Sequence, residues 1–79
     1  MSYELVINAK DRIGLLHEIS SVIAKEKINI KSISSQKNNR RATVYIYLGN
    51  CKGKQEKIIE KIKRVKNIEK IICREKIND

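Results

Sequence analysis

The 79-residue sequence has few of the residue groups from which catalytic and metal sites are built. It contains two cysteines, Cys51 and Cys73, which stand 22 positions apart, and a single histidine, His17. This spacing fits neither a zinc site nor a disulfide framework, so both cysteines are expected to be reduced thiols. Glycine-rich phosphate loops and Cys-x-x-Cys pairs are absent, and the nine acidic residues are scattered along the chain. The sequence therefore predicts no enzyme active site, no cofactor and no metal.

The chain also lacks a long apolar run. No segment approaches the roughly 18 consecutive apolar residues that a membrane-spanning helix needs, and residues 1–4 open a strand-like segment rather than a signal peptide. A soluble, cytoplasmic protein without a membrane partner is expected. A length of 79 residues allows a single domain, expected to cover residues 1–79. Because a domain of this size buries only about 60% of its unfolded surface, association with a partner is also expected.

Acidic residues are half as frequent as basic ones, with 9 Asp and Glu against 18 Lys and Arg, which gives a net charge of +9. Such a charge attracts polyanions, so RNA is a candidate partner. Genomic base composition is the alternative explanation of the lysine content. Basic residues are densest over residues 52–66, where Lys57, Lys61 and Arg64 are expected to share one helical face. This face either contacts RNA or is simply solvated, and both interpretations stay open.

The first half of the chain shows a strand, a helix and a second strand. Residues 3–9 alternate between apolar and polar, with Val6 as the exception, which is typical of a half-buried strand. Residues 13–27 carry apolar side chains at helical spacing, and Asp11 is the expected N-cap. Residues 28–36 form a weaker, serine-rich strand, which is expected at an edge of the sheet.

The second half repeats this order. A turn at residues 38–39 leads into the clearest strand, residues 41–49, which is expected to be central in the sheet. Helical spacing of isoleucines follows over residues 58–65, and residues 68–74 form the last strand. Two such units predict an α+β fold: a ferredoxin-like βαββαβ sandwich, with a four-stranded antiparallel sheet and two helices on one face.

This arrangement leaves the other face of the sheet uncovered. Val6, Tyr45, Tyr47 and Ile72 are expected on that face, and an apolar surface of this kind usually binds something. One alternative function is therefore an RNA-binding βαββαβ module, which stacks bases on aromatic side chains of its third strand. Tyr45 and Tyr47 have the required spacing, although the strand lacks the glycine and the paired aromatics of that signature.

The segment between the first strand and the first helix, residues 8–16, contains Gly14 at a position where glycine weakens a helix by about 1 kcal/mol. Two explanations remain open. The missing Cβ either lets a ligand approach the helix N-terminus, where N–H groups and the dipole favour a carboxylate, or it permits an unusual backbone angle in a tight corner. His17 is expected at the surface, with a role near a ligand as the alternative.

The same segment resembles the opening half of an ACT domain, a small-molecule-binding regulatory module. The resemblance is carried by the run Asp11-Arg12-Ile13-Gly14-Leu15-Leu16, followed by Ile19, Ile23-Ala24 and Asn29-Ile30. The second half, with Asn39-Arg40-Arg41-Ala42-Thr43, a lysine-rich helix and Ile68-Glu69-Lys70-Ile71-Ile72-Cys73-Arg74, is similar to the ACT domain at the C-terminus of RelA/SpoT-type (p)ppGpp synthetases and hydrolases. The resemblance covers residues 3–76.

The resemblance implies a non-catalytic regulatory domain. In that family such a domain senses an amino acid, or contacts ribosome and tRNA, to control a GTP pyrophosphokinase in the stringent response. It further implies a homodimer with an amino acid bound at the interface by residues matching Asp11, Arg12, Gly14, Leu15 and Asn29. Branched-chain amino acids are the candidate ligands. The chain has Ile13 where the family often has proline and Ala9 where serine-binding members have histidine, so the ligand's identity stays open. A freestanding ACT dimer that binds a small amino acid is the alternative.

Overall fold

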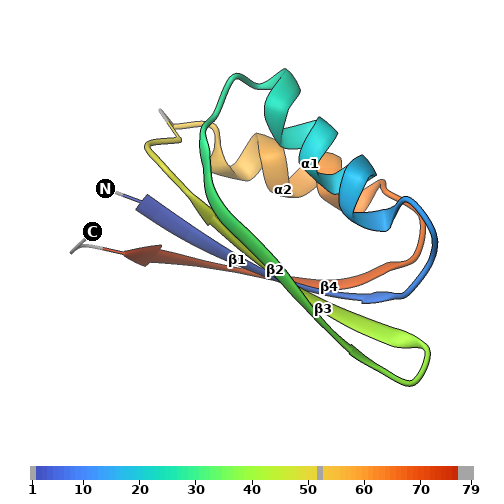
Figure 1. The fold of residues 1–79 in the computed structure, drawn as a ribbon. Helices are drawn as coiled ribbons and strands as arrows, with labels where there is room; N and C mark the ends of the chain where they lie inside the picture. The colour runs from blue at the N-terminus through green and yellow to red at the C-terminus, as the bar shows by residue number, and fades with distance from the viewer. Residues whose placement is uncertain (1, 52, 77–79) are drawn as a thin grey trace.

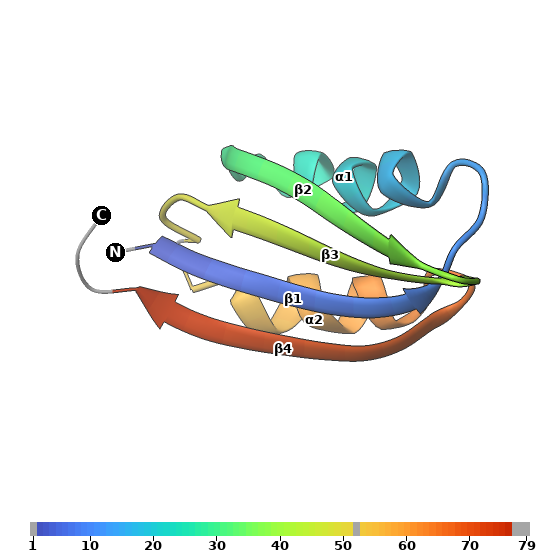
Figure 2. The same ribbon diagram turned by 60° about the horizontal axis from the view of Figure 1, so that its bottom comes forward.

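A computed structural model describes residues 2–51 and 53–76 of the chain. Its elements are β1 (Ser2–Lys10), α1 (Leu15–Lys25), β2 (Ile30–Asn38), β3 (Arg41–Leu48), α2 (Gln55–Lys63) and β4 (Ile68–Lys76). The strands form an antiparallel sheet in the order β2-β3-β1-β4, and both helices cover the same face of it (Figures 1 and 2). The predicted ferredoxin-like βαββαβ fold is confirmed.

The two central strands supply most of the sheet's contribution to the core. Alternate residues of β1 and β3 point toward the helices and are buried: Leu5, Ile7, Ala9, Ala42, Val44, Ile46 and Leu48. Their spacing of two follows from the pleat of a strand, which sends successive side chains to opposite faces. The expected central position of β3 and edge position of β2 are therefore confirmed.

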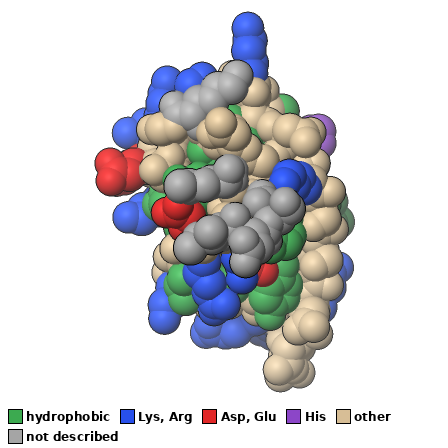
Figure 3. All heavy atoms as spheres, turned by 90° about the vertical axis from the view of Figure 1, so that its left-hand side faces the viewer, with side chains coloured by type: hydrophobic (Ala, Val, Ile, Leu, Met, Phe, Trp, Pro, Cys, Tyr) green, Lys and Arg blue, Asp and Glu red, His purple; other side chains and the backbone are tan. Residues whose placement is uncertain are grey.

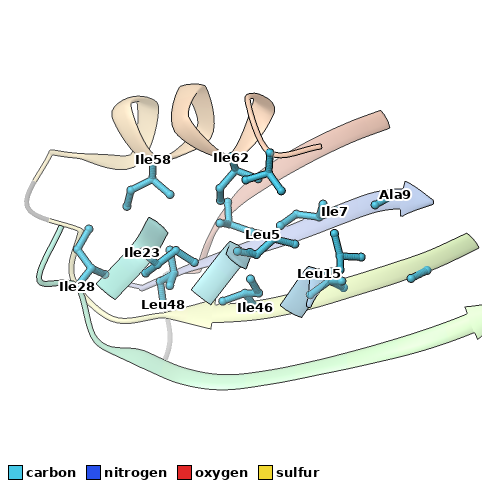
Figure 4. Close-up of a cluster of buried hydrophobic side chains, with 14 of the residues drawn as sticks. Leu5, Ile7, Ala9, Leu15, Ile23, Ile28, Ile46, Leu48, Ile58 and Ile62 are labelled. Carbon is cyan, nitrogen blue, oxygen red and sulfur yellow. The ribbon is translucent and has the colours of Figure 1, made fainter. Parts of the chain in front are cut away.

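Each helix buries one apolar stripe against this layer, as Figure 4 shows. The stripe of α1 is Leu15, Ile19 and Ile23, and that of α2 is Ile58 and Ile62. A spacing of four residues keeps these side chains on one side of each helix. Full burial of a leucine or isoleucine side chain contributes about 1.5–3 kcal/mol, so these two stripes hold the helices on the sheet.

The first helix is shorter than the predicted range of residues 13–27, and its N-cap differs from the prediction. The N-cap is Gly14, with φ of 84°, and no side chain caps the helix. Asp11 lies too early in the corner: its backbone N–H donates to the Arg40 carbonyl over 2.8 Å. At the other end, Lys27 has φ of 60°, a left-handed conformation that ends a helix.

The predicted hairpin turn is displaced by one residue. Asn38 still pairs with Arg41, so the turn consists of residues 39–40, with Asn39 at φ of 59°. Asparagine tolerates this left-handed angle better than most residues. β2 also begins and ends two residues later than the predicted range of residues 28–36, and Ile28 is buried in the connection that precedes the strand.

β1 and β4 lie side by side along their whole length. Their register runs from Ser2 opposite Lys76 to Ala9 opposite Ile68, with an irregularity between Asn8 and Ala9. The last strand therefore extends two residues beyond the predicted range of residues 68–74. The ends of the described chain lie together at one end of the sheet (Figure 1).

Both cysteines are free thiols, as predicted. Cys51 is buried, and its Sγ lies 3.7 Å from the carbonyl oxygen of Gly49. Cys73 is half-buried. Burial raises the pKa of both thiols. Among the described residues, no helix is long and apolar enough to cross a membrane.

Candidate ligand-binding site

A pocket of about 320 Å³ lies beside the corner between β1 and α1. Residues of the corner and of the first helical turn line one side of it, and residues of β2 and β3 line the other. The complete lining is Asp11, Arg12, Ile13, Gly14, Leu15, Leu16, His17, Ser35, Lys37, Ala42 and Val44. Four of the five predicted ligand-binding residues, Asp11, Arg12, Gly14 and Leu15, therefore come together around a single cavity.

Gly14 gives the corner its shape. Its φ of 84° is a left-handed angle that side chains disfavour, while a Cβ added there would meet nothing within 4 Å. Of the two explanations left open by the sequence, the backbone angle is thus sufficient to require glycine. The turn that follows is closed by backbone hydrogen bonds from Leu15 to Arg12 and from Glu18 to Gly14. The positive end of the α1 dipole lies at this turn, beside the pocket.

The charged groups of the corner differ in how firmly they are held. The Arg12 guanidinium lies 2.5 Å from a Glu18 carboxylate oxygen and donates through Nε to the Lys66 carbonyl over 3.3 Å. Arg12 thereby ties the corner to α1 and to the loop before β4. The Asp11 carboxylate, 29% exposed, has a looser partner: the Nζ of Lys37 is 3.5 Å away on a side chain that is mostly exposed. Asp11 is therefore the more available of the two for a ligand.

The floor of the pocket is apolar. Ala42 and Val44 are buried on β3, and the exposed side chains of Leu16 and Ile13 stand at the rim. His17 is exposed, as expected for a surface histidine, and it also lines the pocket. The cavity thus combines a carboxylate and a helix N-terminus with an apolar surface between them.

Two lining residues, Ser35 and Lys37, were absent from the sequence-based prediction. They enter the site because β2 pairs with β3 in a register that sets Ser35 opposite Val44 and Lys37 opposite Ala42. The displaced hairpin turn determines this register. The polar composition of residues 30–38 suggests that this strand could line a binding site, but it does not indicate which of its side chains face α1.

Asn29, the fifth predicted ligand residue, does not line this pocket. It lies just beyond the opposite end of α1, where its carbonyl accepts a hydrogen bond from the Gly49 N–H over 3.0 Å. A helix of 11 residues is about 16 Å long, at 1.5 Å per residue. Within one copy of the chain, Asn29 and the corner are therefore separate.

The basic face of α2 has an internal partner. Glu26, which follows α1, is only 7% exposed, and its carboxylate contacts the Nζ of Lys61 and lies 3.3 Å from that of Lys57. Hydrogen bonding from Lys61, followed by that from Lys57, holds the pKa of Glu26 below its ordinary value. Two of the three residues predicted to contact RNA thus link α2 to α1, whereas Arg64 is exposed.

Three comparisons place the chain among known proteins. The sequence matches the ACT domain family over residues 2–72. It is 36% identical over 70 residues to a UPF0735 ACT domain-containing protein of Fusobacterium nucleatum, in an alignment that covers 84% of this chain and 46% of that protein. The chain thus spans about half the length of this relative.

Solved structures share the fold at low identity. The ACT domain of the GTP pyrophosphokinase of Chlorobium tepidum superposes with a TM-score of 0.77 at 20% identity, covering 92% of this chain and 96% of that one. An ACT domain protein of Streptococcus pneumoniae superposes with a TM-score of 0.74 at 20% identity, covering 94% and 88%. These structures share the fold, and the family match over residues 2–72 shows that the chain belongs to the ACT domain family, whose members are regulatory, non-catalytic domains.

Proposed function

We propose that this ACT domain binds a free amino acid in the pocket beside the β1–α1 corner. The observation that supports this is the placement of the Asp11 carboxylate and the first turn of α1 around one small cavity. An amino acid carries an ammonium and a carboxylate group. The ammonium would replace the exposed Lys37 as the partner of Asp11. The carboxylate would accept hydrogen bonds from the N–H groups at the helix N-terminus. The Asp11–Lys37 pair is long and exposed, so its displacement costs little.

The apolar floor selects the ligand's side chain. Ala42 and Val44 offer no hydrogen-bonding side-chain groups, and Leu16 adds a further apolar wall. A volume of about 320 Å³ is at the lower end of the roughly 300–1,000 Å³ found for small-molecule sites. A branched-chain amino acid suits both properties.

The site is completed in a homodimer formed by β2. This strand is an edge with unpaired backbone groups, and the exposed large apolar residues among those described, Ile13, Leu16 and Ile33, lie in the corner, on α1 and on β2 itself. Antiparallel pairing of β2 with its symmetry mate sets the start of one strand beside the end of the other. Asn29 of one copy would then approach the Asp11 corner of its partner and join the same site.

The domain would transmit occupancy of this site to a larger enzyme of the RelA/SpoT type, a (p)ppGpp synthetase/hydrolase active in the stringent response. Support comes from the sequence likeness of the second half of the chain and from the fold shared with the ACT domain of the GTP pyrophosphokinase of Chlorobium tepidum. A freestanding ACT dimer with the same ligand is the second candidate, since the similar protein of Streptococcus pneumoniae is described simply as an ACT domain protein. The length of the natural reading frame distinguishes the two.

Thermal unfolding with each of the twenty amino acids tests the binding proposal. A ligand that binds only the folded state at 100 times its Kd stabilises it by about 2.7 kcal/mol, which raises the melting temperature. Valine, leucine or isoleucine should give the largest rise, and Asp11→Asn should remove it. Lys37→Gln, which removes only the displaced partner, should retain the rise. If no amino acid at millimolar concentration moves the melting curve, the proposal fails.

A further inference from the structure

The uncovered face of the sheet carries a second and larger depression, at the end where β2 and β3 join. Its volume is about 1310 Å³, and the side chains that line it include Asn8, Gln36, Arg40, Arg41, Thr43 and Lys70. Thr43 donates a hydrogen bond to the Asn8 side-chain oxygen over 3.0 Å. This leaves the Asn8 amide NH₂ as a donor for a ligand. The depression has about four times the volume of the first pocket, and most of the side chains that line it are polar or charged.

An aromatic surface lies next to this depression along the strands, as the strand register shows. Asn8 lies opposite Thr43 and Lys70, and the next row on the same face sets Val6 opposite Tyr45 and Ile72. Tyr47 follows in the row after that, opposite Glu4. Alternate residues of a strand are about 6.8 Å apart. The two half-exposed tyrosines therefore form successive steps along β3, directly beyond the polar depression.

The charge of this face identifies its occupant. Alternation along the strands puts five cations on it, Lys10, Arg41, Lys70, Arg74 and Lys76, against the carboxylates of Glu4 and of Glu69 at the irregularity in β4, a local balance of +3. Glu4 pairs with Arg74 and Lys76, and Glu69 pairs with Arg41. Within the described residues, no ion pair engages Lys10, Lys70 or the neighbouring Arg40. Two copies meeting through this face would oppose like charges, whereas a polyanion would neutralise them.

We propose that the open sheet face binds single-stranded nucleic acid. Phosphates contact Lys70, Arg40 and Lys10 around the depression, and bases stack on the rings of Tyr45 and Tyr47. Proteins that bind single strands with little sequence preference generally combine a basic groove for the phosphates with aromatic side chains on which the bases stack. The amino-acid site lies on the helix-covered side of the sheet, and Lys37 and Ala42 line both cavities. The contacts proposed for nucleic acid use neither of these residues and none of the lysines that hold Glu26.

Fluorescence anisotropy with labelled oligouridylate and oligothymidylate of about twelve nucleotides tests the proposal, because single-strand sites of this kind span roughly 4–16 nucleotides. Both probes should bind the full chain at low salt. Tyr45→Leu should weaken binding about five- to hundred-fold, and Tyr45→Phe, which keeps the ring, should not. Lys70→Gln should lower the slope of log affinity against log salt by about 0.7, the value for one phosphate contact on a single strand.

Lys25→Gln is the matched control, since Lys25 is an exposed lysine at the end of α1, on the helical side. It should leave both affinity and salt slope unchanged. Equal losses in Lys25→Gln and Lys70→Gln would reduce the effect to net charge and overturn the proposal, as would equal binding by the Leu and Phe variants of Tyr45. Absence of binding at low salt would also overturn it. The amino-acid-induced rise in melting temperature should persist in Tyr45→Leu, so the two proposals can fail separately.

Discussion

Lys61 on α2 contacts the carboxylate of Glu26, which follows the last residue of α1 and is almost completely buried. Lys54 adds a hydrogen bond from its Nζ to the Glu26 carbonyl over 3.2 Å. α2 and its N-cap residue thus satisfy both the side chain and the backbone of one residue at the end of α1. A buried carboxylate without these partners would be strongly disfavoured, so the pairing acts on stability.

Lys61→Gln is therefore expected to destabilise the domain, although it changes a partly exposed residue. The variant leaves Glu26 buried with Lys57 as its remaining cation. Chemical denaturation should show a lower midpoint than for the wild type, with an unchanged slope. Lys63→Gln, two residues further on at an exposed position, is the control and should behave as the wild type does. Equal midpoints for the two variants would contradict the role assigned to Lys61.

The same pair makes stability depend on pH. Because the folded-state pKa of Glu26 lies below its ordinary value of 4.5, its contribution is fully present above that value and is lost as the pH falls through the folded-state pKa. Melting temperatures between pH 6 and pH 3 should therefore fall less in Glu26→Gln than in the wild type. Identical pH profiles would show that the carboxylate is not stabilised by its lysines.

Glycine is favoured where φ is positive, so removing it from one such position and introducing it at another should change the stability of the domain in opposite directions. Gly14→Ala places a Cβ at φ of 84° and should cost about 1–2 kcal/mol, although no atom obstructs it. Lys27→Gly relieves the same strain at φ of 60° and should stabilise the domain by up to about 1 kcal/mol. Ala24→Gly, at an exposed position inside α1, is the control and should cost about 1 kcal/mol. Denaturation midpoints of the three variants measure these differences.

Ile33 lies on the β2 edge and is 39% exposed. If β2 forms the dimer, Ile33→Lys should produce monomers at about 100 μM, a concentration at which a micromolar dimer would persist. Light scattering measures this directly. Ile72→Lys, on the open face, is the control and should remain dimeric. A wild-type chain that is monomeric at the same concentration would refute the dimer.

Periodicity made most of the fold predictable, because the alternation in β1 and β3 and the spacing of Leu15, Ile19 and Ile23 reflect burial directly. The ends of elements were harder. Asp11 is a good N-cap by composition, but the helix begins at Leu15 because the chain first passes through the left-handed Gly14. That choice depends on the corner's backbone path, which local propensity does not encode.

The candidate site was predictable only on its corner side. Lys37 joins Asp11 through strand register, and Glu26 is buried through the packing of one helix against the other. Both are contacts between residues far apart in sequence. A charged residue at a helix end, such as Glu26, is normally exposed to solvent, so no pattern in the sequence predicted its burial.

The antiparallel register of β1 and β4, with Ser2 opposite Lys76, has a mechanical consequence. A force that pulls the two ends of the domain apart acts at the same end of this strand pair. It would open the β1–β4 hydrogen bonds one after another rather than shear them all at once. The domain should therefore yield to low tension, with β4, which packs beside α2, peeling away from β1 first.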